Sequence, residues 1–218
     1  MLKIPLFPLN TVLFPGMPLR LHIFEERYKL MIQRCMQESL TFGVVLIQQG
    51  TEALGPLAQP YQVGCTAQIT QVERLSMGRM NIMAVGKSRF KIESLDDSEP
   101  FLMGNVDLWP LFVRDREALR PVERSLRHWV GRYLRALESA GQTKITMAEL
   151  PHETLIFGYL AATLLQIPAR QKQPLLESEA PLDFLQALRD LYRKEVALLD
   201  VLLEKPGHAP PADQAKLN

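Results

Sequence analysis

The sequence predicts an α+β fold, in which a small, strongly bent or closed sheet with one helix precedes a bundle of three or four helices. Two observations support this order. Short apolar segments separated by turn residues continue to residue 108, and helical periodicity replaces them after Trp109. We expect a β-rich domain at residues 1–112, a helical domain at residues 113–206 and a disordered tail at residues 207–218.

The opening of the chain is apolar but rich in proline, which fixes φ and lacks a backbone donor. These prolines are Pro5, Pro8, Pro15 and Pro18. They exclude an interior helix, and strands tolerate proline only at edges or bulges. We therefore expect two extended pieces, residues 2–9 and 18–24, joined by a turn in which Gly16 takes a positive φ.

Helical periodicity follows the opening and then gives way to strands. A helix begins near Glu25, and its apolar stripe comprises Tyr28, Met31, Ile32, Cys35 and Met36. Further strands are expected at residues 42–47, 64–72, 79–85, 89–93 and 102–108, with turns at Met77-Gly78 and Gly86-Lys87-Ser88. Strands this short favour a sheet that closes or bends, which hides its edges.

The second half of the chain contains helical segments bounded by proline or glycine. Pro121 suits a first helical position, and an apolar face follows it up to a stop at Gly141. Residues 152–166 are apolar nearly all round, as in the buried centre of a bundle. After a short connector at residues 168–177, Pro181 opens the longest helix. Its inward stripe comprises Leu185, Leu188, Tyr192, Val196, Leu199 and Leu203.

Composition narrows the classes of function. The 47% hydrophobic and 22% charged fractions are ordinary for a soluble protein, and a formal net charge of +1 gives no overall attraction to nucleic acid or anionic lipid. Cys35 and Cys65 lack CxxC spacing and follow no signal peptide, which indicates reduced thiols and a cytoplasmic location. The longest apolar run, residues 155–167, is too short for a membrane anchor.

Several ordered motifs carry a resemblance to a known family. They are IPLFPLNTVLFPGMPLRLHIFEERY at residues 4–28, Phe42-Gly43, Gly64-Cys65-Thr66-Ala67, Gly78-Arg79 and Gly86-Lys87-Ser88-Arg89-Phe90-Lys91-Ile92. Together they resemble the amino-terminal, substrate-binding domain of the ATP-dependent Lon proteases, which also occurs as a free-standing bacterial protein and within cereblon. The segment IPARQKQPLLESEAPLDFLQ is more loosely similar to that family's linker between bundle helices.

The resemblance implies a PUA-like β barrel followed by a helical bundle. It also implies recognition of unfolded or tagged protein substrates and a part in subunit assembly, without catalysis. The chain reaches Asn218 without an ATPase domain or a protease domain with a Ser/Lys dyad, so we expect the free-standing bacterial form. Its expected partners are unfolded or extended polypeptide segments, and formation of a homo-oligomer stays open.

Motifs for catalysis or metal binding are incomplete. Gly86-Lys87-Ser88 would need a glycine in place of Asn81 to form a phosphate-binding loop, so we interpret it as a hairpin turn. His152-Glu153 lacks the second histidine of HExxH, which would stand at Ile156. There is no G-x-S-x-G nucleophile elbow, and the paired carboxylates are adjacent rather than converged. We expect no enzymatic activity, no cofactor and no metal.

Five residues in and after the proline-rich opening are the expected peptide-binding site. They are Phe14, Met17, Phe24, Arg27 and Tyr28. Aromatic and Met side chains beside proline-interrupted strands can form an adaptable apolar groove, and free strand donors there can pair with an extended peptide. Because the same side chains would suit a barrel core, we expect only about two or three of them to line a surface groove.

A basic helix face supports the alternative of RNA or nucleotide binding. Residues 114–135 contain seven arginines against three acidic residues, and Arg124, Arg132 and Arg135 gather opposite the apolar stripe. PUA-like domains elsewhere often bind RNA, which adds an analogy. No aromatic residue interleaves this face for base stacking, and Glu138 could pair with Arg132. Nucleic acid is the less favoured partner, and a purely structural assembly module is the third alternative.

Overall fold

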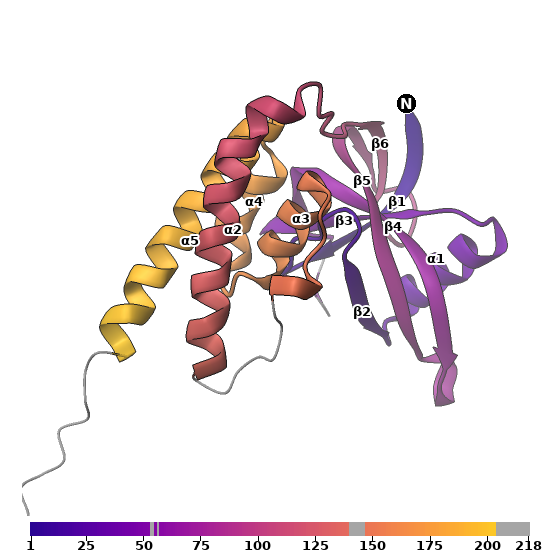
Figure 1. Cartoon of the computed structure of the whole chain (residues 1–218). Coiled ribbons are helices and arrows are strands. Elements are labelled where there is room, and N and C mark those ends of the chain that lie inside the picture. The colour runs from indigo at the N-terminus through magenta and orange to yellow at the C-terminus, as the bar shows by residue number, and fades with distance from the viewer. Residues whose placement is uncertain (53–54, 56, 140–146, 204–218) are drawn as a thin grey trace, which may run out of the picture.

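The computed structural model describes residues 1–52, 55, 57–139 and 147–203, with the backbone alone for Ala148, Leu202 and Leu203 (Figure 1). Its strands are β1 (Leu2–Leu9), β2 (Pro18–Ile23), β3 (Phe42–Gln49), β4 (Gln59–Arg74), β5 (Met80–Asp96) and β6 (Met103–Leu108). Its helices are α1 (Glu26–Gln37), α2 (Arg116–Ser139), α3 (Thr154–Leu164), α4 (Ala169–Leu176) and α5 (Pro181–Leu203), with 3-10 turns at Ser76–Gly78 and Met147–Glu149. The fold is mixed α+β, as the sequence predicts.

The described strands form one sheet in the order β2-β5-β4-β3-β1-β6, and β5 pairs in addition with β6. β1 is parallel to β3, and the other pairings are antiparallel. Because β5 is 17 residues long, its first part pairs with β2 and β4 while its last part reaches β6. Among the described strands, β1, β3, β4, β5 and β6 therefore each pair with at least two neighbours, whereas β2 pairs only with β5. In Figure 1, α1 lies on the side of the sheet away from α2 and α5.

The proline-rich opening folds as the sequence predicts, but one expected turn is wrong. Gly16 has a φ of 79° in the turn between β1 and β2. Gly86 does not reverse the chain, because it lies inside β5 and pairs with Ala67 of β4. A Cβ on Gly86 would come within 2.3 Å of the Phe14 carbonyl oxygen. The glycine therefore lets the β1–β2 turn cross directly over the strand.

The start of α2 also differs from the expectation. α2 begins at Arg116, and Pro121 lies inside it. The Asp115 carboxylate accepts hydrogen bonds from the backbone N–H groups of Glu117 at 2.9 Å and Ala118 at 3.3 Å. This cap satisfies donors that the first turn of a helix leaves free, which explains the earlier start.

Two further expectations concern the helical half. The sequence predicts α5 as the longest helix; its described part has 23 residues and reaches Leu203, after which the structure describes no further residue, while α2 has 24 residues. The four residues of the inward stripe of α5 from Leu185 to Val196 are at most 1% exposed, and Leu199 packs against the same core. The expected stop at Gly141 and tail at residues 207–218 lie outside the described residues, as does the side chain of Leu203.

One buried apolar cluster continues from the sheet into the helices. It includes Phe42 and Met80 of the sheet and Phe157, Phe184 and Tyr192 of the helices. The predicted boundary at residues 112 and 113 falls in the segment between β6 and α2, and apolar side chains from both sides of it share this core. The sheet is therefore supported from the helical side.

Arg89 of β5 forms a polar connection between the same two regions. Its side chain is buried, and Nη1 donates to the carbonyl oxygens of Leu176 at 2.6 Å and Ser178 at 2.8 Å. The guanidinium lies over the ring of Trp109, 4.5 Å from its centroid. Desolvation lowers the pKa of this guanidinium. The two carbonyl groups belong to the end of α4 and the residues after it, so Arg89 fixes this helix end against the sheet.

Candidate functional site

The outer edge of β2 is not paired with any strand in the described part of the chain. Its inner edge pairs with β5 without a register shift, and just before this ladder the Gly86 N–H donates to the Met17 carbonyl oxygen over 2.9 Å. Because the residue pairs of an antiparallel ladder alternate, the backbone groups of Pro18, Arg20 and His22 point away from β5. Pro18 thus stands where β5 needs no donor, whereas Arg20 and His22 present N–H and C=O groups at the free edge.

Two hollows flank this edge and share Arg20, Leu21 and His22. The first has a volume of about 290 Å³ and is lined in addition by Phe7, Leu9, Ile23, Phe24, Glu25, Tyr28 and Glu52. The second has a volume of about 640 Å³ and is lined in addition by Gln71, Val72, Glu73, Asn81, Ile82 and Met83. We call the free edge with its two hollows the β2 site.

A chain of polar contacts orders the second hollow. His22 Nδ1 donates to Asn81 Oδ1 at 2.8 Å, and Asn81 Nδ2 donates to Glu73 Oε2 at 2.8 Å. The ring of Phe24 stacks beside the His22 ring, with 5.9 Å between the centroids. These contacts run from β2 across β5 to β4, so they hold the edge in place while leaving Phe24 open to solvent.

Two of the five residues expected to bind peptide line the β2 site. Phe24 is 44% exposed at its rim. Tyr28 is 5% exposed and contributes to its floor, where its ring stacks on Phe7 with 4.0 Å between the centroids. Burial raises the pKa of the Tyr28 phenol, so this side chain is neutral at physiological pH.

The other three expected residues support the site from inside. Phe14 and Met17 are 1% and 6% exposed, and the Phe14 ring stacks on Tyr159 of α3 at 6.1 Å. Neither side chain lines the two hollows, and Tyr159 of α3 packs on the ring of Phe14. Arg27 pairs with Glu25 over 3.0 Å and is largely enclosed, with 16% of its side chain exposed. Its role in the structure is to fix the start of α1.

The sequence prediction missed Arg20, Leu21 and His22, which both hollows share. The signal was present in Pro18, because a strand that opens with proline is expected at an edge of a sheet. Which edge stays unpaired depends on the partners of β1, β5 and β6, and these partners are distant in sequence. The spacing of apolar residues therefore identified the strand but not its open side.

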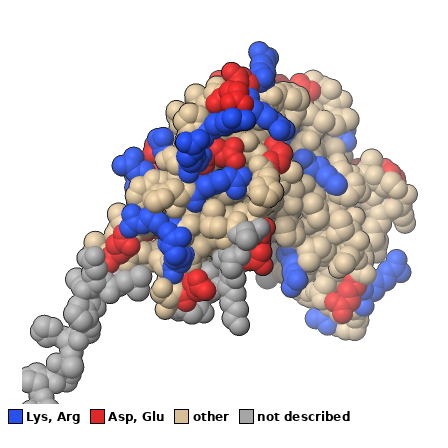
Figure 2. Space-filling model, viewed as in Figure 1, with Lys and Arg blue, Asp and Glu red and all other residues tan. Residues whose placement is uncertain are grey.

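The arginines of the basic face are placed on the outer side of α2. Arg124 and Arg135 are exposed, whereas Arg132 pairs with Asp200 of α5 at 2.7 Å rather than with Glu138. Two further arginines of α2 pair with carboxylates of the same helix. Figure 2 shows Lys and Arg next to Asp and Glu over the helical half, so the positive charge is divided rather than continuous.

The described ranges contain neither a metal-binding cluster nor a membrane-spanning helix. Within them, no three His, Cys, Asp or Glu side chains converge in a way that could hold a metal ion. None of the helices there combines the length and apolar character needed to cross a membrane.

Sequence comparisons match the chain to one family. A family model described as the ATP-dependent protease La (LON) substrate-binding domain matches residues 3–194. The Lon protease of Cytophaga hutchinsonii is 25% identical over 206 residues, which are 92% of this chain and 25% of that protein. The Lon protease of Parabacteroides distasonis is 32% identical over 106 residues, 47% of this chain and 13% of that protein. The chain thus spans a quarter or less of the length of these relatives.

Structural comparisons match the same fold. The crystal structure of a Lon N-terminal domain protein from Xanthomonas campestris has a TM-score of 0.64 and 24% identity, covering 94% of this chain and 100% of that one. The N-terminal domain of a Mycobacterium avium complex Lon protease has a TM-score of 0.67 and 17% identity, covering 88% of this chain and 98% of that one. At these identities the likeness establishes the fold.

Proposed function

Because the chain belongs to the family of ATP-dependent protease La (LON) substrate-binding domains, we propose that it binds unfolded or extended polypeptide segments and catalyses no reaction on them. The observation that carries this proposal is the free edge of β2 between two hollows. An unpaired strand edge offers backbone donors and acceptors to any extended chain, whatever its sequence.

The binding mechanism follows from the geometry of an edge strand. A bound segment adds to the sheet beside β2, where the outward backbone groups of Arg20 and His22 supply its hydrogen bonds. Its side chains alternate between the two faces of the sheet, so successive residues enter opposite hollows. Phe24 and Leu21 offer apolar contact, and acidic and basic groups both line the hollows. Such a site accepts many sequences with modest affinity for each.

We also propose a more detailed description of the fold and a cellular location for the protein. The ring of pairings from β1 through β3, β4, β5 and β6 back to β1 supports a PUA-like barrel, and the packing of α2 against α5 supports a helical bundle. We take the protein to act in the bacterial cytoplasm, with the division between its sheet region and its helical region at residues 112 and 113. A homo-oligomer is compatible with this role, and nucleic acid is the less favoured partner.

The test removes one outward backbone donor from β2. A labelled peptide from an unfolded protein is titrated by fluorescence anisotropy against the parent, Arg20→Pro and Arg20→Ala. Proline at position 20 deletes an N–H that β5 does not use. We expect the affinity to fall about tenfold, because the peptide loses roughly one hydrogen bond and a regular strand to pair with. Arg20→Ala removes the same side chain but keeps the N–H, so we expect it to bind more tightly than Arg20→Pro, and the difference between the two variants isolates the backbone donor.

The controls separate binding from folding. Circular dichroism and thermal unfolding establish that both variants retain the parent's secondary structure before any titration is interpreted. If the parent shows no saturable binding, the proposed function is wrong. Equal binding by Arg20→Pro and the parent would instead place the peptide away from the β2 edge.

A further inference from the structure

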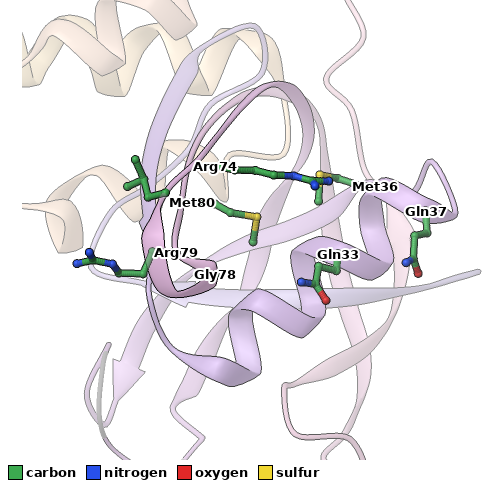
Figure 3. Close-up of a pocket in the computed structure, with 8 residues that line it drawn as sticks. Gln33, Met36, Gln37, Arg74, Gly78, Arg79 and Met80 are labelled. Carbon is green, nitrogen blue, oxygen red and sulfur yellow. The ribbon is translucent and has the colours of Figure 1, made fainter.

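A separate cleft lies between α1 and the hairpin of β4 and β5, and we propose that it binds an acidic, apolar segment of another polypeptide through Arg74 (Figure 3). Its volume is about 520 Å³, within the range of roughly 300–1,000 Å³ that is usual for ligand pockets. α1 contributes Gln33, Met36 and Gln37, and the hairpin contributes Arg74, Leu75 and Met80 among others.

This cleft is distinct from the β2 site. The two share no lining residue. They are nevertheless close, because Met80 of the cleft stands opposite Ile23 of β2 in the β2–β5 register. One polypeptide could therefore contact both, but the chemistry of the cleft can be tested without assuming that β2 binds anything.

Contacts at the tip of the hairpin fix one wall of the cleft. The buried Lys29 of α1 donates from Nζ to the Met77 carbonyl oxygen at 2.9 Å and pairs with Glu26 at 2.7 Å. Arg79 donates from Nε and Nη2 to the backbone oxygen and hydroxyl of Ser76, at 3.2 and 3.0 Å. The two walls are therefore tied together before any ligand arrives, which lowers the ordering cost of binding.

The charge of the lining selects an anion. Two of the eight lining residues are arginines and none is acidic. In Figure 3 the Arg79 side chain points away from α1, whereas Arg74 extends from the hairpin toward α1. Within the described part of the chain, Arg74 has no carboxylate at ion-pair distance. Its guanidinium is thus available to a carboxylate from outside, in the bidentate geometry that arginine favours.

The acidic residues next to the cleft in sequence are already engaged. Glu38 pairs with Arg34 at 3.3 Å, and Glu73 accepts the hydrogen bond from Asn81 at 2.8 Å. Neither neutralises Arg74. Arg74 therefore keeps its charge available for an anionic ligand.

The remaining side chains indicate a peptide rather than a nucleic acid. Met36, Leu75 and Met80 form an apolar wall, and methionine adapts to side chains of different shape. Gln33 and Gln37 lie one turn apart on α1, so their amides can bond an extended backbone. No aromatic residue lines the cleft for base stacking. The combination fits an Asp or Glu side chain next to an apolar one.

The experiment measures a preference for charge. A short labelled peptide that alternates Glu and Leu, and its isostere that alternates Gln and Leu, are titrated against the parent, Arg74→Gln and Arg116→Gln. Arg116 is an exposed arginine at the start of α2 and provides the matched loss of one charge. We expect the parent to prefer the Glu peptide about tenfold, Arg116→Gln to keep that preference and Arg74→Gln to lose it. Binding at β2 would add to both titrations and is the part that Arg74→Gln leaves unchanged.

In a second pair of variants, one adds a carboxylate to the cleft and the other adds a carboxylate elsewhere as a control. Gln33→Glu should abolish the preference for the Glu peptide, while Gln171→Glu, at an exposed position of α4, should leave it unchanged. The proposal is overturned if the parent binds both peptides equally, or if Arg74→Gln retains the full preference. Tighter binding of an oligo-uridine RNA than of the Glu peptide, with the RNA lost in Arg74→Gln, would also overturn it in favour of a phosphate site.

Discussion

The β2 edge and the outer face of α2 both invite a binding hypothesis, and they differ in what the fold leaves without a partner. At β2 the unpartnered groups are backbone donors and acceptors. No strand in the described part of the chain pairs with them. On α2 the charged groups are conspicuous, yet Arg132 and two other arginines already pair with carboxylates. The side-chain pattern of the sequence therefore displays the charges of the helix face without their pairing, and it does not display which strand edge is unpaired.

The largest expected effect concerns the crossing that positions β2. Gly86→Ala would bring a Cβ to 2.3 Å from a backbone oxygen, so we expect a loss of about 3 kcal/mol or more in the free energy of unfolding. Gly16→Ala meets no atom within 4 Å and strains only a φ of 79°, which should cost about 1 kcal/mol. Urea unfolding of the two variants measures the difference. Equal losses would contradict the assigned role of the crossing.

An intermediate effect concerns pH and the sheet that supports β2. Burial raises the pKa of the Cys65 thiol from 9.0 to about 12. The unfolded chain releases this proton above pH 9 while the folded chain retains it, so stability is complete below pH 9 and falls as pH rises toward 12. We expect Cys65 to contribute a loss of about 1 kcal/mol per pH unit in that window.

Cys65→Ala provides the comparison for this pH dependence. Unfolding free energies of the parent and the variant, measured at several alkaline pH values, should converge as pH rises because the variant lacks the titrating thiol. Burial also raises the pKa of the Cys35 thiol to about 11, so part of the slope should remain in the variant. Parallel pH profiles for the two proteins would show that Cys65 ionises equally in both states.

The smallest expected effect concerns the basic face itself. Reversing two exposed charges, in the double variant Arg124→Glu and Arg135→Glu, should leave the affinity for unfolded peptide within about twofold of the parent, because surface charges away from a site contribute little. The same variant should be titrated with a short RNA at several salt concentrations. If the parent instead binds RNA with an affinity that falls steeply with salt, and the variant loses that binding, the result would favour α2 over the β2 edge as the binding surface.

Local signals were sufficient for much of the sheet region. Prolines and a positive-φ glycine identified β1, β2 and their turn, and an i, i+3, i+4 stripe identified α1. Glycine at position 86 could mark either a reversal or a close approach. The chain that approaches it is the Phe14 carbonyl, which is distant in sequence, so periodicity alone cannot choose between the two.

The candidate site was harder to predict from the sequence for a similar reason. Phe14, Met17 and Phe24 have the same apolar character in the sequence, but Tyr159 of α3 packs on the first while the third stays open. Likewise the partner of Arg132 lies on α5 rather than within its own helix. Burial and pairing at these positions depend on tertiary contacts, which a single sequence does not display.

The Arg89 connection limits how freely the two regions can be recombined. A sheet fragment ending at residue 112 would lose the Leu176 and Ser178 carbonyl oxygens that accept from this guanidinium, along with the apolar side chains of α3 and α5. An exchange of helical segments between homologues would need to preserve the position of both carbonyl groups. The region that follows the sheet thus contributes two backbone acceptors to a buried cation in addition to its apolar side chains in the shared core.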